Sequence, residues 1–405
     1  MNFSNRLRLK VLEREHPSLE LPGSSSVTSV LSRERSERVV KFLKPLRAIA
    51  ISHVPMENGL TGNRMRTRAR KFSYAGGLLK NPKIAIIILN WNGKHDTLAC
   101  LESLEQLTYP HFEVIVVDNG SSDDSSSLIR KRFPQHLLIE NGDNLGFAEG
   151  CNVGMREAME RGAGLFFLLN NDTVVAPDIL ERFVEMSHSH PEAGILGARI
   201  YLFDQTQTLD HLGGLWNRKT GTFELVGKQQ QDTEPDSNPQ ELDYVCGAGL
   251  IIKRKVIETI GYLDPRFFLI WEESDYCFRA SRAGFKILTC PHAKLWHKVS
   301  ASFVGGKPHS TYFWWRNRLL WIEKNCSPYE KTSLYFHILI PDILHMLKIQ
   351  LIKTVQLSFT KKFRRKINIK EKNEKLLKNR AALCGVRDYM VRRFGKGPDW
   401  LHMIK

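Results

Sequence analysis

The sequence lacks several features that define common classes of protein. Its seven cysteines are scattered over 405 residues without a Cys-x-x-Cys pair, which argues against a zinc ribbon and favours a reducing compartment. No uninterrupted apolar stretch reaches the length of about 18–20 residues that a membrane-spanning helix needs, so none is expected. Residues 1–80 also lack the continuous apolar segment of a secretory signal. With 42% hydrophobic and 25% charged residues, the composition excludes a wholly disordered chain and a collagen.

Charge is distributed unevenly along the chain. The net charge of +16 divides into +10 for residues 1–80, −7 for residues 81–330 and +13 for residues 331–405. A core domain that bound nucleic acid would share the basic character, so no nucleic-acid partner is expected. The basic ends instead favour contact with an anionic membrane surface. We therefore expect a cytoplasmic protein, and attachment to the inner face of the cell membrane stays open.

The N-terminal 80 residues differ from the rest in composition. Arg-rich pieces alternate with Ser-rich pieces, which predicts a basic flexible extension. A small accessory domain and an over-extended start site remain alternatives. The main folded domain is expected in residues 81–305, and a helical, basic region in residues 306–405.

From Lys83 onward, short apolar runs alternate with helix-like stretches. The runs cover 84–89, 112–117, 137–139 and 164–169, and the helix-like stretches cover 96–107, 126–133 and 150–161. This alternation predicts an α/β fold in which βαβ crossovers build a mostly parallel sheet flanked by helices. Ligands of such sheets bind beyond the carboxyl ends of the strands. Polar triplets follow three of the runs, namely Asn90-Trp91-Asn92, Asp118-Asn119-Gly120 and Asn170-Asn171-Asp172.

Composition and residue spacing predict the character of two later segments. Residues 204–243 are polar and rich in Gln, Asp and Pro, which predicts a long surface insertion. Leu344, Leu347 and Leu351 lie at helical spacing, and a run of Lys and Arg follows at 361–366. This pattern fits a helix lying in the membrane interface, and equally a core helix that packs on the main domain. Both interpretations stay open.

Four motifs form an ordered series along the main domain. They are Ile88-Leu89-Asn90-Trp91-Asn92-Gly93, Val116-Val117-Asp118-Asn119-Gly120-Ser121-Ser122-Asp123, Asn144-Leu145-Gly146-Phe147-Ala148-Glu149-Gly150-Cys151-Asn152 and Trp271-Glu272-Glu273-Ser274-Asp275-Tyr276-Cys277-Phe278-Arg279. With them, residues 83–305 resemble the inverting, family-2 glycosyltransferases of the GT-A fold, in particular bacterial rhamnosyltransferase-like members. The resemblance implies a GT-A catalytic domain, a nucleotide-diphospho-sugar donor, a divalent Mg²⁺ or Mn²⁺ ion, and a hydroxyl acceptor. The donor dTDP-L-rhamnose and a lipid-linked glycan acceptor in polysaccharide synthesis also follow from the resemblance alone.

The donor side is expected at the first three motifs. The ionised carboxylate of Asp118 can accept a hydrogen bond from a pyrimidine N–H, although capping of the following turn is the alternative. Glycines such as Gly146 can let the backbone approach a diphosphate at a helix N-terminus, or can serve close helix–sheet packing. By resemblance, the nucleotide-sugar-binding residues are Asn90, Asn92, Asp118, Asn144, Gly146, Asn152, Asn171 and Arg316. Of these, Arg316 would offset the charge of the diphosphate.

The metal is expected at Asp172 and His297. Asp172 follows an apolar strand, and a hard divalent cation needs only one such carboxylate when the substrate adds its phosphates. Relatives usually have Asp-x-Asp, but here Asn170 stands first, which leaves Asp172 as the direct ligand. A turn cap is the alternative for Asp172. His297 matches a position where relatives place a histidine near the metal, although a histidine after apolar residues can also be a core side chain.

The catalytic base is expected at Glu273. Transfer to a hydroxyl needs a carboxylate that removes the acceptor proton as the anomeric carbon is attacked. Glu273 holds that position in the acidic motif, where most relatives have Asp. A helix N-terminus whose acidic residues offset the macrodipole is the alternative. By resemblance, the acceptor-binding residues are Cys246, Gly247, Trp271 and Glu272. An inverting transfer of this kind requires the carboxyls of Asp172 and Glu273 to face one cleft.

Two other functions compete with this one. A sugar nucleotidyltransferase also needs a nucleotide-binding sheet and a metal, but it usually has a Gly-rich loop with Lys or Arg after the first strand. Here that place holds Asn90-Trp91-Asn92-Gly93 and only Lys94. A non-catalytic module that binds a membrane surface or nucleic acid through the basic ends is the third candidate.

Overall fold

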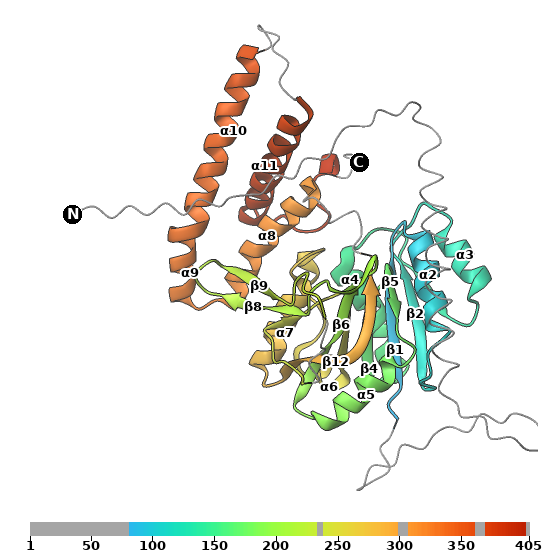
Figure 1. Ribbon diagram of the computed structural model, residues 1–405. Coiled ribbons are helices and arrows are strands. Elements are labelled where there is room, and N and C mark those ends of the chain that lie inside the picture. Colours follow the sequence, from blue (N-terminus) through green and yellow to red (C-terminus); the bar gives the residue numbers. More distant parts are fainter. Residues whose placement is uncertain (1–80, 233–237, 299–306, 361–368, 402–405) are drawn as a thin grey trace, which may run out of the picture. The chain divides into compact units, whose positions relative to one another are not determined.

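The computed structural model describes residues 81–232, 238–298, 307–360 and 369–401, without the side chains of 353–360 and 369–373 (Figure 1). All described residues belong to one compact unit. The predicted basic extension of residues 1–80 lies outside the described residues.

The centre of the described chain is a nine-stranded mixed sheet. Its strand order is β3-β2-β1-β4-β11-β6-β12-β5, with β7 paired to β6. Strands β1 to β4 are parallel, as predicted, and they run through Ile84–Asn90, Phe112–Asp118, Leu137–Glu140 and Leu165–Asn170. The register pairs Asn90 with Asp118 and Leu89 with Asn170, so the polar strand ends lie at one edge.

Helices cover both faces of these parallel strands. The helices of the first half are α2 (Lys94–Leu104), α3 (Ser125–Arg132), α4 (Gly146–Glu160) and α5 (Ile179–Ser189). Alternate side chains of β1 enter two different core clusters, with Ile86 in one and Ile87 in the other. Strand β1 is therefore buried on both faces, which explains its continuous apolar sequence. Gly154 of α4 leaves no room for a side chain, because a Cβ there would lie 2.6 Å from Ile87.

The second half of the sheet departs from a simple parallel arrangement. Its strands are β5 (Thr173–Val175), β6 (Ala193–Leu202), β7 (Gln205–Leu209), β11 (Gly249–Lys253) and β12 (Lys286–His297). Strand β11 is antiparallel to both β4 and β6, whereas β12 is parallel to β6 and antiparallel to β5. The connecting helices are α6 (Arg254–Ile260) and α7 (Glu272–Arg282). The sheet confirms the predicted α/β class and brings His297, at the end of β12, opposite Thr173 of β5.

Residues 204–243 are not the plain surface insertion that their composition predicted. Besides β7, their described part contains β8 (Gly213–Asn217) and β9 (Thr222–Val226), which form a second sheet with β10 (Tyr244–Val245). The ring centroids of Trp216 and Trp321 lie 4.1 Å apart, and Phe223 lies 5.2 Å from Trp321. Burial of these aromatic rings anchors the hairpin on the core despite its polar sequence.

The C-terminal region is helical, as predicted. It consists of α8 (Pro308–Asn325), α9 (Pro328–Leu334), a π-helical turn (Tyr335–Leu339), α10 (Ile340–Thr360) and α11 (Ile369–Met390). Helix α11 packs closely on α8, since a Cβ at Gly385 would lie 2.4 Å from the Tyr312 carbonyl oxygen. By length and composition alone, residues 328–352 could cross a membrane, with a mean hydropathy of 1.2 and only 11% of the apolar window buried. No membrane-spanning helix was expected from the sequence, because ionisable residues interrupt its apolar stretches.

Candidate active site

The ends of β1 and β2 form a buried polar cluster. The Asn90 side-chain amide donates to Asp118 Oδ1 at 2.6 Å and to Ser121 Oγ at 3.0 Å. The backbone N–H of Ser121 donates to Asp118 Oδ2 at 2.9 Å. Asp118 thus caps its own turn, and each carboxylate oxygen keeps one further acceptor position. The turn cap and the predicted base-binding role are therefore compatible.

Asn92 braces the loop after β2. Its φ of 52° is left-handed, and its side-chain oxygen accepts hydrogen bonds from the backbone N–H of Ser122 at 2.8 Å and of Asp123 at 3.3 Å. Asp123 in turn accepts from the Ser125 N–H and so caps α3. Asn92 therefore shapes the predicted nucleotide-binding loop, and its side-chain carbonyl oxygen is already occupied by these hydrogen bonds.

Asn144 and Gly146 form the predicted donor-side loop together with Asn119. The Asn144 side-chain oxygen accepts from Asn119 at 2.9 Å and from the Gly146 N–H at 2.9 Å. Gly146 has a φ of 83°, and a Cβ there would lie 2.5 Å from the Phe268 ring. The Phe268 carbonyl accepts from the N–H groups of Phe147 and Ala148. The first turn of α4 is thus capped by protein backbone, so these two N–H groups do not fit the predicted diphosphate contact.

Two other predicted donor residues make contacts within the protein. Asn152 is buried and pairs with both backbone groups of Leu263, at 2.9 Å and 3.0 Å. It therefore holds the chain before α7 and does not fit a direct donor contact. Asn171 donates to Thr97 Oγ1 at 2.9 Å, and Thr97 donates in turn to Asn90. Asn171 is therefore connected to the polar cluster at the ends of β1 and β2.

Asp172 and His297 lie side by side at the same end of the sheet. His297 Nε2 is 3.2 Å from Asp172 Oδ1, and His297 Nδ1 is 2.9 Å from Asp210 Oδ2. Burial alone would lower the pKa of His297, but the hydrogen bonds to the two carboxylates outweigh it and raise the pKa to about 10. The imidazole is therefore protonated at neutral pH, and its positive charge lies between the carboxylates of Asp172 and Asp210.

His211 continues this chain of ionisable groups towards the acidic motif. Its Nδ1 lies 3.4 Å from Asp210 Oδ1, and it hydrogen-bonds to Cys246. The charge of His211 also acts on Glu273, where it opposes the effect of burial on the pKa. Asp210 and His211 thus connect the predicted metal ligands with the predicted base. Sequence reasoning missed both, although an adjacent Asp and His inside a polar segment was a signal that could have singled them out.

Glu272 and Glu273 open helix α7, but their surroundings differ. Glu272 is buried, and burial together with the Glu273 charge raises its pKa well above the usual value. Burial also raises the pKa of Glu273, yet that side chain is only half-buried. One oxygen of each carboxyl is buried without a hydrogen-bond partner. Glu272 therefore fits a neutral buried acid better than the predicted acceptor contact, whereas Glu273 combines access with a pKa moved towards neutral pH, as a general base requires.

The predicted acceptor loop lies against Glu273. A Cβ at Gly247 would lie 3.4 Å from Glu273 Cγ, so the loop backbone lies within one side-chain contact of Glu273. Cys246 is buried and contacts His211. A cavity of about 10 Å³, room for about one water, adjoins Gly247, Glu272 and Glu273.

Trp271 and Arg316 do not fit their predicted contacts with substrate. Trp271 is buried among aromatic rings, with Phe223 at 5.5 Å and Trp321 at 5.9 Å between ring centroids. Arg316 is fully buried, and its five donors all have acceptors within the protein. Its guanidinium group therefore cannot offset a diphosphate without losing these bonds.

Arg316 and its neighbour Asn317 hold the segment that leads into α7. Arg316 donates to the carbonyls of residues 266 and 267, and Asn317 donates to those of 267, 269 and 270. Phe268, Ile270 and Trp271 have positive φ values of 63°, 70° and 79°. Such a strained backbone persists only where the surroundings fix it, and here it sets the position of the Glu272–Glu273 pair.

A metal fits this site only together with substrate. Among the residues that the structure describes, no group of three or more His, Cys, Asp or Glu side chains is arranged to hold an ion. Asp172 and His297 offer one oxygen and one nitrogen, and a divalent cation between them must replace the imidazole proton. A substrate diphosphate would supply the remaining ligands, as is common for Mg²⁺.

Comparisons with known proteins agree with this geometry. Residues 85–261 match the model of the family described as "Glycosyl transferase family 2". N-acetylglucosaminyl-diphospho-decaprenol L-rhamnosyltransferase of Mycobacterium tuberculosis is 25% identical over 258 residues, covering 55% of this chain and 82% of the relative. dTDP-rhamnosyl transferase RfbF of Shigella flexneri is 23% identical over 257 residues, covering 61% and 82%. A crystal structure of GalNAc-T7 with UDP, GalNAc and Mn²⁺ matches with a TM-score of 0.51 at 15% identity, covering 62% of this chain and 50% of that one.

The family match and the named relatives make this chain a glycosyltransferase, and its fold is the GT-A architecture. Within that class, residues 85–261 form a family-2 domain, and the similarity to two rhamnosyltransferases confirms the rhamnosyltransferase-like resemblance seen in the motifs.

Proposed function

We propose that this enzyme transfers L-rhamnose from dTDP-L-rhamnose to a hydroxyl of a lipid-linked glycan, with inversion at the anomeric carbon, in cell-surface polysaccharide synthesis. The names of two relatives support the sugar, the nucleotide and a lipid-linked acceptor. The observation that carries the proposal is the placement of Glu273. Its half-buried side chain lies at the N-terminus of α7, in contact with Gly247. The charge of His211 acts on it, and His211 is connected through Asp210 and His297 to Asp172.

In this proposal, the donor binds at the ends of β1, β2 and β4. Asp118, held by Asn90, accepts a hydrogen bond from the base. Asp172 and His297 would hold a divalent cation, which neutralises charge on the departing diphosphate. Asp210 keeps the His297 ring oriented through its Nδ1. The acidic side chains at this end thus position the leaving group.

On the opposite face of the sugar, Glu273 acts on the acceptor. It removes the proton from the acceptor hydroxyl while the oxygen bonds to the anomeric carbon, and the bond from that carbon to the diphosphate breaks. One displacement of this kind inverts the configuration. Because burial raises the pKa of Glu273, the carboxylate is a better proton acceptor than an exposed one. That Asp172 and Glu273 face one cleft stays a prediction, and the chain through His297, Asp210 and His211 supports it.

The location remains the one expected from the sequence. We propose that the enzyme works in the cytoplasm at the inner face of the membrane. The basic ends of the chain support this, as do the seven cysteines, all free in the structure.

Donor hydrolysis over a panel of nucleotide sugars tests the proposed substrate. With Mn²⁺ present, we expect release of dTDP from dTDP-L-rhamnose at a rate at least about tenfold above UDP-glucose, UDP-GlcNAc or GDP-mannose, because several contacts must match base and sugar. EDTA and Asp172→Asn should each abolish the release. Equal hydrolysis of all donors would contradict the proposed sugar. Formation of a sugar phosphate and a nucleoside triphosphate with pyrophosphate would instead indicate a nucleotidyltransferase.

A further inference from the structure

An unpartnered apolar stripe runs along the C-terminal helices. Phe336, Ile340, Leu344, Leu347 and Leu351 succeed one another at intervals of three or four residues, and these five residues are called the stripe. Such spacing places them along one side of a helix. All five are exposed, with exposed fractions of 60% for Leu344 and 68% for Leu351. At 1.5 Å per residue the stripe is about 22 Å long.

The other side of the same helix is attached to the protein. Leu339 and Met346 are buried, and Asn379 of α11 donates to the Met346 carbonyl oxygen at 2.9 Å. Figure 1 shows α10 beside α11, which itself packs on α8. The stripe is therefore not simply the inner face of a core helix, because the core already occupies a different side.

Ionisable side chains decide against a helix surrounded by lipid. Asp342, His345 and Lys348 are exposed and are interleaved with the stripe residues. Asp342 also lies 4.0 Å from Arg318 of α8, at the protein side of the helix. A helix with an apolar side, a polar side and one edge fixed to a folded domain suits the interface of a membrane and not its interior.

Basic residues follow α10 in the sequence, and a basic side chain lies near the first residues of the stripe. In the sequence, residues 361–366 read Lys-Lys-Phe-Arg-Arg-Lys directly after α10; they lie outside the described residues. At the other end, the hydroxyls of Tyr335 and Tyr389 are 3.2 Å apart, which brings the end of α11 to the stripe. There Met390 and Val391 are exposed, with 73% and 61% of their surface, next to the exposed Arg393. Apolar and basic side chains side by side fit an anionic lipid surface.

We propose that the stripe docks the enzyme on an anionic lipid bilayer, with α10 lying along the interface. A surface of this kind would keep the catalytic domain close to acceptors that are carried by lipid. The docking rests on the membrane location proposed above and names the surface responsible for it, and it does not depend on the identity of the donor sugar.

Vesicle flotation of the full chain tests this proposal. The vesicles are pure phosphatidylcholine, or phosphatidylcholine with about one-third phosphatidylglycerol. We expect binding to the anionic vesicles, and binding at least about tenfold weaker for L344Q/L347Q/L351Q, because three leucines that enter the bilayer in this proposal would become polar. The matched control is L215Q/L225Q, which changes two leucines of the β8–β9 hairpin that are also exposed, with fractions of 45% and 38%. It should bind as the wild type does.

Several results would overturn the docking. One is equal vesicle binding by the stripe variant and the wild type, or no binding by the wild type. Another is retention of the wild type in native membranes after an alkaline carbonate wash, which would indicate a spanning helix. A dimer that the stripe variant abolishes, with vesicles left unbound, would assign the stripe to contact between copies. Turnover with a water-soluble acceptor should be unchanged in the stripe variant, so a failure of docking is distinguishable from a failure of the proposed function.

Discussion

Glu272 and Glu273 are adjacent in sequence, but their environments assign them different chemistry. Both carboxyls start α7, where the helix dipole favours negative charge, yet burial outweighs the dipole in both. Glu272 is almost fully covered, whereas Glu273 is partly open beside Gly247. Burial thus favours the neutral acid at Glu272, whereas the Glu273 side chain is partly accessible to a substrate.

The raised pKa of Glu272 predicts how stability depends on pH. The folded state keeps the Glu272 proton at pH values where the unfolded chain has lost it, so this residue lowers the free energy of unfolding as pH rises above about 4.5, its usual pKa. Glu272→Gln removes this loss. Urea denaturation should show that the free energy of unfolding of the variant, relative to that of the wild type, rises by up to about 1.4 kcal/mol per pH unit from pH 5 upward. A difference that does not change with pH would show that the carboxyl is ionised in the folded enzyme.

The sequence identified some site residues and missed others for physical reasons. Glu273 was predicted because it lies within a local motif that follows a fixed order. Asp210 and His211 join the site through the turn between β7 and β8, and their adjacency in the sequence does not show which distant residues they contact. The role of Arg316 also depends on burial, because the same guanidinium could have bound either a diphosphate or backbone carbonyls.

Between elements, the segment from Pro265 to Trp271 connects α4, α7 and α8. The Phe268 carbonyl caps α4, and the carbonyls around it accept from Arg316 and Asn317 of α8. Movement of α8 would therefore shift both the donor-side loop and the helix that carries Glu273. The contact ties α8, and not the later helices, to the catalytic domain.

Asn317→Ala tests the role of this connection. Loss of bonds to the carbonyls of Phe267, Leu269 and Ile270 should destabilise the protein by about 1–3 kcal/mol. The turnover number should also fall, because the strained segment no longer fixes Glu273, and steady-state kinetics with a soluble acceptor would measure it. Asn379→Ala is the matched control, since Asn379 likewise donates to a backbone carbonyl but lies between α10 and α11. Equal kinetics for the two variants would contradict the positioning role.

The elements themselves were predictable to different degrees. Strands β1 to β4 were found because burial on both faces requires continuous apolar runs, and α2 to α4 because helices must connect parallel strands. The antiparallel insertion of β11 between β4 and β6 depends on pairing across about fifty to eighty residues, which composition cannot show. The hairpin of β8 and β9 was missed because its aromatic anchors, Trp216 and Phe223, are two residues in an otherwise polar segment.

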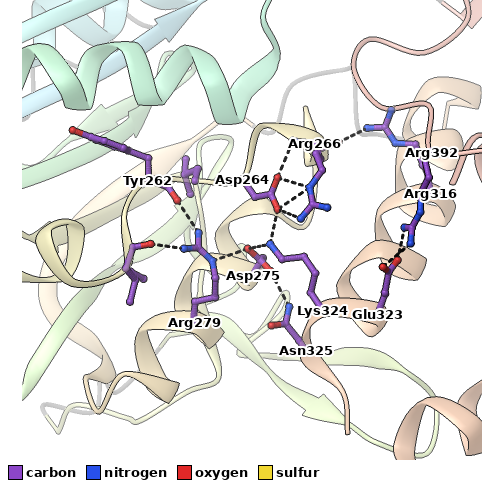
Figure 2. Close-up of polar contacts among 12 residues, drawn as sticks. Tyr262, Asp264, Arg266, Asp275, Arg279, Arg316, Glu323, Lys324, Asn325 and Arg392 are labelled. Carbon is purple, nitrogen blue, oxygen red and sulfur yellow. Dashed lines mark hydrogen bonds and ion pairs between the residues drawn. The ribbon is translucent and has the colours of Figure 1, made fainter. Parts of the chain in front are cut away.

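In the molecule as a whole, a buried ion network joins the catalytic sheet to the C-terminal helices. Asp275 of α7 is fully buried and accepts from Lys324 at 2.8 Å, Asn325 at 2.9 Å and Arg279 at 3.0 Å (Figure 2). Lys324 also reaches Asp264 at 2.6 Å. Burial would raise the pKa of Asp264, but Arg266 and Lys324 outweigh it and lower the pKa below the usual range.

Asp275→Ala should therefore destabilise the whole enzyme. Removal of the fully buried carboxylate leaves Lys324, Arg279 and Asn325 each without one acceptor, at a cost of about 3–5 kcal/mol, although Lys324 keeps its contact with Asp264. Denaturation by urea would measure the change. For comparison, Asp178→Ala removes an exposed ion pair with Arg182 and should cost less than about 1 kcal/mol. A small effect of Asp275→Ala would mean that α7 and α8 are held together mainly by their apolar contacts.

The most direct test of the account is the kinetics of Glu273→Gln on donor and acceptor together. We expect the turnover number to fall by at least about a thousandfold, while the dissociation constant of the donor stays within a few-fold, because the variant loses the proton acceptor but keeps the donor site. Glu258→Gln, a change of the same kind on the exposed surface of α6, should leave both unchanged. Near-normal turnover of Glu273→Gln, or a product that retains the anomeric configuration of the donor in its NMR spectrum, would contradict Glu273 as the base of an inverting transfer.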